Sequence, residues 1–166
     1  MPVKFNSGRT TISQFEMKDA EHLFACILPA ITVFMPWEPP SSVDQLRERR
    51  QELMGTAAFD DFWFVIRDRK TSECLGSASI NDAASNTPEI GIWLRKTVHG
   101  HGYGSETIRA LCRWASQCFD PQGFIYPVAI ANVPSRRIAE RLGGTVIAHR
   151  TNPKYASVVY RIPRQP

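Results

Sequence analysis

The sequence predicts an α/β protein in which helices cover one mixed, mostly antiparallel β-sheet. Stretches with the composition of strands alternate with stretches of helical period, in the order β-α-α-β-β-β-α-β-α-β-β. The chain has 166 residues, about the size of one domain, so we expect a single domain over residues 1–166. It contains no internal repeat and no low-complexity segment. A sheet packed against helices is the arrangement that buries such a set of elements.

The N-terminal half is expected to hold one strand, two helices and a hairpin. Their expected ranges are 10–15, 17–28, 42–54 and the two hairpin strands 62–68 and 73–80. Asp19 lies near the start of the first helix, and three prolines over residues 34–42 separate the two helices. Ser42 is a residue type that caps helix N-termini, so we expect it to cap the second helix.

The C-terminal half is expected to alternate strands and helices before a final hairpin. Its expected elements are a strand at 89–95, a helix at 105–117, a strand at 124–130, a helix at 134–144 and strands at 145–150 and 155–162. Pro134 suits the first turn of the short helix, and Gly143 suits its end. Pro127 removes a ladder donor from its strand, which is tolerated best where strand pairing is interrupted.

The composition is that of a globular protein: 43% of the residues are hydrophobic and 22% are charged. No apolar run approaches the length of a bilayer span, and the first residues lack an apolar signal core, so we expect a cytoplasmic protein. The four cysteines are too scattered for a disulfide framework or a zinc knuckle. The net charge of +4 favours anionic partners, either nucleic acid or a phosphorylated cofactor. The basic cluster at residues 47–50 is expected to be a solvated helix face.

The segment His-Gly-His-Gly-Tyr-Gly, residues 99–104, follows a predicted strand and opens a predicted helix. A glycine-rich turn at a helix N-terminus presents free backbone N–H groups to an anion. It could also be only a tight connection. The lysine of a P-loop is missing, and the next strand runs into Asn132 instead of the acidic residue of a dinucleotide fold. His99 and His101 alternate in a turn and point apart, so no metal site is expected.

With a second motif, "NVPSRRIAERLGG" at residues 132–144, this segment resembles the GCN5-related N-acetyltransferases (GNAT), in particular the RimJ/RimL-like subgroup. The stretch 89–115 is similar to the family's fourth strand, pyrophosphate loop and following helix. The order of elements agrees over nearly the whole chain. The resemblance implies a mixed sheet whose fourth and fifth strands, here 89–95 and 124–130, splay apart around acetyl-CoA. No metal is implied.

The resemblance also implies which residues hold acetyl-CoA. The backbone of Ile92, Trp93 and Leu94 would bind the pantetheine arm, and Asn132 would contact the pantetheine or acetyl end. The pyrophosphate would lie against the backbone amides of Gly100, His101, Gly102, Tyr103, Gly104 and Ser105. His99 stands where the family motif has Gln or Arg, so a contact on the pyrophosphate side would be weaker or pH-sensitive.

Acetyl transfer to an amine requires a base, a polarised thioester carbonyl and a proton for the leaving thiolate. The resemblance assigns the polarising amide to Trp93 or Leu94. Glu89, at the mouth of its strand, is the expected base, acting through water, or else is an exposed strand-end carboxylate. Ser135 is the expected acid, because Ala139 stands where many family members have a tyrosine acid. Ser135 could instead be only a helix cap.

The expected function is transfer of acetyl from acetyl-CoA to a primary amine, with a protein N-terminal α-amine favoured. The alternatives are acetylation of a polyamine or aminoglycoside-type amine, and a non-catalytic acetyl-CoA-binding module. The acceptor amine would be approached from segment 32–40, where Phe34, Met35, Trp37 and Glu38 could line a pocket. Phe34 and Met35 could instead pack in the core, and Glu38 could attract a cationic amine. We expect no nucleic-acid or membrane partner, and a monomer or homodimer.

Overall fold

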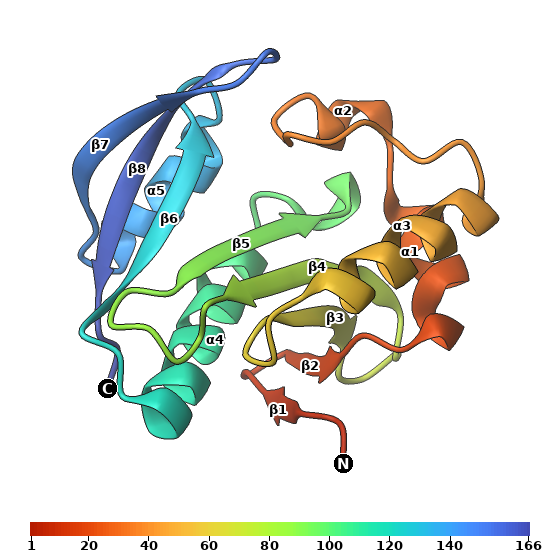
Figure 1. Cartoon of the computed structure of the whole chain (residues 1–166), viewed down its shortest axis with the longest axis horizontal. Coiled ribbons are helices and arrows are strands. Elements are labelled where there is room, and N and C mark those ends of the chain that lie inside the picture. The colour runs from red at the N-terminus through yellow and green to blue at the C-terminus, as the bar shows by residue number, and fades with distance from the viewer.

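The computed structural model describes residues 1–166 and contains one eight-stranded sheet (Figure 1). The strands are β1 (Lys4–Asn6), β2 (Thr10–Gln14), β3 (Phe62–Asp68), β4 (Cys74–Asn81), β5 (Glu89–Leu94), β6 (Gly123–Ala129), β7 (Thr145–Thr151) and β8 (Ala156–Pro163). Their order across the sheet is β1-β2-β3-β4-β5-β6-β8-β7. Every neighbouring pair is antiparallel except β5 and β6, so the predicted mixed, mostly antiparallel sheet is confirmed.

Helices pack on both faces of this sheet (Figure 1). They are α1 (Ala20–Cys26), α2 (Pro29–Thr32), α3 (Val43–Thr56), α4 (Tyr103–Phe119) and α5 (Val133–Arg141), with short 3₁₀ turns at Met17–Asp19 and Lys96–Val98. Helix α1 packs against β4 and α3, whereas α4 packs against β5 and α5. Two separate apolar clusters follow from this division: α4 covers one that includes Ile12 and Phe64, and α1 and α3 cover another that includes Phe15 and Trp93.

The fourth and fifth predicted strands, β5 and β6, diverge after a single paired position (Figure 1). Only Glu89 and Ile125 are in register, and Ile125 N donates to Pro88 O at 2.9 Å. Strand β6 then continues alongside β8 over its whole length. Since backbone groups alternate along a strand, the nitrogen of Pro127 lies on the same edge as that of Ile125, facing the gap. A proline is tolerated there because the gap offers its nitrogen no ladder partner.

The elements expected from the sequence are present with shifted ends. Ser42 caps α3, because its Oγ accepts a hydrogen bond from Gln45 N at 3.1 Å. The helix expected over 17–28 is shorter, since a 3₁₀ turn occupies its first residues and the backbone of Ile27 is extended. Two short elements, β1 and α2, were not predicted.

Candidate active site

A cavity of about 600 Å³ opens where β5 and β6 separate. Its walls come from β4, β5, β6, α3, the segment after α2, the start of α5 and the β7–β8 hairpin. Five of the residues predicted for the site line it: Glu89, Ile92, Trp93, Asn132 and Ser135. Leu94, the last residue of β5, and the segment 99–105 that follows lie outside the lining. The lining residues predicted from the sequence therefore come from β5 and from the start of α5.

The open edge of β5 carries the backbone groups of its even-numbered residues. Arg95 N donates to Leu75 O of the β4 side, and Pro88 O accepts from Ile125 N of the β6 side. By strand alternation, the amides of Ile92 and Leu94 face the gap and that of Trp93 faces β4. An ideal Cβ on Gly76 of β4 would lie 2.1 Å from Trp93 O, which agrees with this direction. Of the two amides expected to polarise a carbonyl, only that of Leu94 lies on the open edge.

The glycine loop, residues 99–104, presents a row of free donors. Gly100 and Gly102 have φ angles of 77° and 82°, which glycine adopts without the strain of a side chain. The N–H groups of residues 100–105 donate to no acceptor within the protein, and Glu106 N is the first to bond back, to Gly102 O at 3.1 Å. Six successive amides at the N-terminus of a 17-residue helix form an arrangement suited to an anion.

Two basic side chains hold this loop in place. His99 Nε2 lies 2.7 Å from Leu94 O and donates to it, so the imidazole turns back toward β5. Arg9 Nη2 donates to His101 O at 2.9 Å, and its guanidinium carbon lies 4.0 Å from the centre of the Tyr103 ring. Arg9 is in turn paired with Glu106, at 2.8 Å. The N-terminal segment, for which the sequence suggested no role, thus fastens the loop.

Glu89 faces the cavity and pairs with Arg150 of β7. Arg150 Nη1 donates to Glu89 Oε2 at 2.9 Å, and Oε1 has no hydrogen-bond donor from the protein. Both side chains remain partly exposed. The free oxygen keeps Glu89 available as a proton acceptor, while the guanidinium fixes the direction of the carboxylate.

Ser135 is held by a residue that the sequence analysis missed. Ser135 Oγ lies 2.5 Å from the hydroxyl of Tyr126 in β6. Burial raises the pKa of Tyr126 to about 12, with the bond to Ser135 opposing the shift, so the phenol stays neutral. Asn132, and not Ser135, caps α5, because its Oδ1 accepts from Ser135 N at 3.4 Å. The cap hypothesis for Ser135 is therefore wrong. Tyr126 could have been found from the sequence, because the hydroxyl of a tyrosine inside a buried strand needs a polar partner.

The segment between α2 and α3 contributes apolar walls. Phe34, Met35 and Trp37 line the cavity, and Trp37 packs edge-on against Trp93 with ring centres 6.1 Å apart. Glu38 is not part of the lining. Its carboxylate pairs with Lys154 Nζ at 3.1 Å, so the suggested attraction of a cationic acceptor by Glu38 is not supported.

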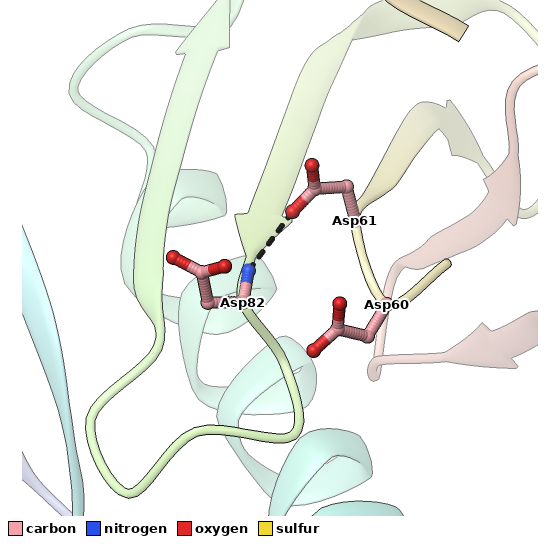
Figure 2. Close-up of side chains that lie close together, drawn as sticks. All are labelled: Asp60, Asp61 and Asp82. Atoms are coloured by element: carbon pink, nitrogen blue, oxygen red, sulfur yellow. Dashed lines mark hydrogen bonds between the residues drawn. The ribbon is translucent and has the colours of Figure 1, made fainter. Parts of the chain in front are cut away.

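Three aspartates gather outside the cavity, at the start of β3 and the end of β4 (Figure 2). One carboxylate oxygen from each of Asp60, Asp61 and Asp82 lies within 4.8 Å of the others. Asp61 accepts a hydrogen bond from Asp82 N at 2.9 Å and Asp60 accepts one from Ala84 N at 3.0 Å, so two of the carboxylates stabilise the local turn.

All four cysteines are free thiols. None of the helices combines the length and apolarity needed to cross a bilayer.

Two splayed strands with a cavity between them, beside a loop of free amides at a helix N-terminus, are suited to bind a small molecule that carries an anionic group. Comparison with known families agrees. Residues 9–145 match the family described as the acetyltransferase (GNAT) domain. The chain belongs to this family and is an acetyltransferase. Members of the family use acetyl-CoA as their cosubstrate.

Three individual similarities are informative. The chain is 29% identical to the Bacillus subtilis (strain 168) protein named "Putative ribosomal N-acetyltransferase YdaF", covering 80% of this chain and 76% of that one. The structure resembles RimL, a ribosomal L7/L12 alpha-N-protein acetyltransferase, with a TM-score of 0.82 at 18% identity over 98% and 95% of the two chains. It also resembles a spermidine N-acetyltransferase SpeG chimera of Vibrio cholerae and hSSAT, with a TM-score of 0.77 at 17% identity over 95% and 96%. The last two likenesses show the fold and not the acceptor.

Proposed function

We propose that this acetyltransferase transfers the acetyl group of acetyl-CoA to a primary amine, with a protein N-terminal α-amine as acceptor. The observation that carries the proposal is the row of six free amides over residues 100–105 beside the cavity between β5 and β6. The similarity to the YdaF protein, whose name refers to ribosomal N-acetylation, favours a protein acceptor.

The residues around the cavity fit the cosubstrate in three places. The amides of residues 100–105 would receive the pyrophosphate, since they have no internal acceptor and the helix dipole of α4 favours negative charge there. On the open edge of β5, backbone groups of Ile92 and Leu94 are available to bind the amide groups of the pantetheine arm. Asn132 keeps its side-chain NH₂ group free while Oδ1 caps α5. Acetyl-CoA supplies the activated acetyl group as a thioester.

The proton transfers are assigned to two side chains on opposite walls of the cavity. Glu89 Oε1 accepts a proton from the ammonium form of the acceptor through a water molecule, so that the neutral amine attacks the carbonyl carbon. The N–H of Leu94 polarises the carbonyl oxygen. When the C–S bond breaks, Ser135 donates its hydroxyl proton to the leaving thiolate, and the second proton that the attacking nitrogen loses restores the hydroxyl. The buried phenol of Tyr126 hydrogen-bonds to Ser135 Oγ and fixes its orientation.

The test is release of free thiol from acetyl-CoA in the presence of N-terminal peptides, polyamines and aminoglycosides. We expect turnover with peptides. Turnover confined to a polyamine or an aminoglycoside would assign the acceptor to the small-molecule class. Binding of acetyl-CoA without turnover of any amine would instead indicate a non-catalytic binding module.

The role of Ser135 is tested with a matched pair of serine variants. Ser135→Ala is expected to lower kcat at least tenfold with little change in the Kd of acetyl-CoA, because the hydroxyl acts only when the thiolate leaves. Ser41→Ala, an exposed position before α3, serves as the control. An unchanged kcat in Ser135→Ala would remove this residue from the mechanism.

A further inference from the structure

The cavity has an excess of positive charge at the end that α3 forms. Its lining includes the three arginines Arg49, Arg50 and Arg150 and one acidic residue, Glu89. Arg150 and Glu89 pair with each other at 2.9 Å. The charges of Arg49 and Arg50 are therefore not balanced by any acidic residue of the cavity wall.

Helix α3 separates its arginines by face. Arg47, on the outer side, pairs with Asp44 and Glu21, each at 3.0 Å. Leu46, Arg49, Arg50 and Leu53 occupy the helical stripe that faces the cavity. The sequence alone predicted a solvated face for the whole basic cluster, and the structure shows that its three arginines are each partly exposed, with Arg49 and Arg50 lining the cavity.

The two cavity arginines have no anionic partner within the protein. Arg49 donates to two neutral acceptors, Glu38 O at 2.7 Å and Gln45 Oε1 at 3.1 Å. The guanidinium carbon of Arg50 lies 5.3 Å from the centre of the Phe15 ring, and neither a carboxylate nor a carbonyl accepts from its nitrogens. Burial lowers the pKa of Arg50, and no charged neighbour opposes this effect. Arg50 is only partly buried and lines the cavity without an anionic partner, so its N–H donors are available to a ligand.

The two arginines lie away from the loop that we propose for the pyrophosphate of the donor. The free amides of that loop lie at the N-terminus of α4, which packs on one face of the sheet (Figure 1). Helix α3 packs on the other face, with the cluster that contains Phe15 and Trp93. None of the residues 99–105 lines the cavity that Arg49 and Arg50 face. The unpaired cations therefore lie on the acceptor side.

We propose that Arg49 and Arg50 bind a carboxylate of the acceptor, so that the amine acetylated by this protein belongs to an acidic molecule. This inference rests on the proposed acetyl transfer and specifies its substrate class. A guanidinium has five N–H donors in a planar fork that matches a carboxylate, and all five of Arg50 are available. The carboxylate belongs either to acidic side chains near a protein N-terminus or to a free amino acid. A polyamine, which carries only positive charge, is disfavoured by the same arginines.

The experiment compares acceptors that differ only in charge. One pair consists of C-terminally amidated peptides that begin with serine followed by two glutamates or two glutamines; the other pair is free serine and serine amide; spermidine is the cationic probe. We expect a kcat/KM at least about tenfold higher for the carboxylate-bearing member of one pair. A preference within the peptide pair assigns the carboxylate to side chains, and one within the serine pair assigns it to an amino acid. Equal rates within both pairs, or a preference for spermidine, would overturn the proposal.

The variants Arg50→Met and Arg50→Lys test the residue, with Arg47→Met as the control on the outer face of the same helix. Arg50→Met is expected to raise the KM for the acidic acceptor about ten- to a hundredfold, the range for loss of hydrogen bonds to a charged group, and to leave the KM for acetyl-CoA unchanged. Arg50→Lys should restore part of the preference, and Arg47→Met should retain all of it. The preference for the acidic acceptor should be lost in Arg50→Met at an unchanged KM for acetyl-CoA, and its retention there would remove Arg50 from the carboxylate site.

A binding measurement separates this proposal from the proposed function. Trp37, Trp63 and Trp93 line the cavity, so their fluorescence reports binding of the two peptides without turnover. Tighter binding of the glutamate peptide that is lost in Arg50→Met supports the carboxylate site even if no acetyl transfer is detected. Acetyl transfer to both peptides and to both serine compounds, with equal affinities and equal rates within each pair, would support the enzyme and refute the carboxylate site.

Discussion

Glu106, in the first turn of α4, links the N-terminal segment to the glycine loop, and Glu106→Gln tests the strength of that link. Its carboxylate accepts hydrogen bonds from Ser7 Oγ at 2.5 Å, Arg9 N at 2.6 Å and Arg9 Nε at 2.8 Å. Burial would raise the pKa of Glu106, but the hydrogen bonds from Ser7 and Arg9 together hold it below its usual value. The substitution keeps the size of the side chain and removes the charge that these donors stabilise.

The magnitude follows from the exposure of the pair. Hydrogen bonds to a charged group contribute about 1.5–3 kcal/mol each when buried, but the Arg9 side chain is 45% exposed, so solvent screens its share. We expect a loss of about 1.5 kcal/mol at pH 7, which corresponds to a fall in Tm of about 3–6 °C for a chain of this size.

The pH dependence of this loss has a definite sign. Because the pKa of Glu106 is lowered by folding, its contribution is complete above the unfolded value of about 4.3 and disappears as the pH falls through the folded value. Thermal melting of Glu106→Gln and wild type between pH 7 and pH 3 should therefore give curves that converge in acid. Glu48→Gln, at an exposed position of α3, is the matched control. Equal melting temperatures at pH 7, or a deficit that persists in acid, would refute this account of the link.

Three further substitutions test the site. Tyr126→Phe should lower kcat several-fold at an unchanged KM for acetyl-CoA and cost about 1 kcal/mol in unfolding free energy, because Ser135 loses its partner. A kcat equal to that of the wild type would argue against the positioning of Ser135 by Tyr126. Gly76→Ala should cost at least about 2 kcal/mol in urea unfolding, because its Cβ would lie 2.1 Å from the carbonyl oxygen of Trp93; an unperturbed midpoint would contradict this. Gly102→Val should abolish acetyl-CoA binding in calorimetry with the fold retained, and undiminished affinity would exclude the loop as the pyrophosphate site.

Local signals in the sequence were sufficient to predict most of the fold. Hydrophobic period, proline positions and the cap at Ser42 depend on neighbours in the chain, and they located all but the shortest elements. β1 was missed because three residues are too few to show alternation. α2 was missed because its four residues, Pro29–Thr32, are too few to show a helical period.

The site could be predicted only where its residues are close in sequence. The glycine loop lies in one segment and was identified from its pattern. The contacts that orient Glu89, Ser135 and His101 come from Arg150, Tyr126 and Arg9, which are 61, 9 and 92 residues away. These partners are set by how strands, helices and the N-terminal segment pack together, which no local pattern reveals. The division of the α3 arginines between two faces has the same origin, since it depends on what packs against the helix.

Gly104 lets α4 and α5 lie close together on one face of the sheet. One paired position, Glu89 with Ile125, joins β5 and β6 directly. Helix α4 packs against β5 and α5, whereas α5 also packs against β6 and β8, so the two helices bridge the strands that the ladder leaves apart. An ideal Cβ on Gly104 would lie 2.6 Å from Ile138 Cδ1 of α5. The missing methyl group at Gly104 therefore lets this bridge form without displacing the Ile138 side chain.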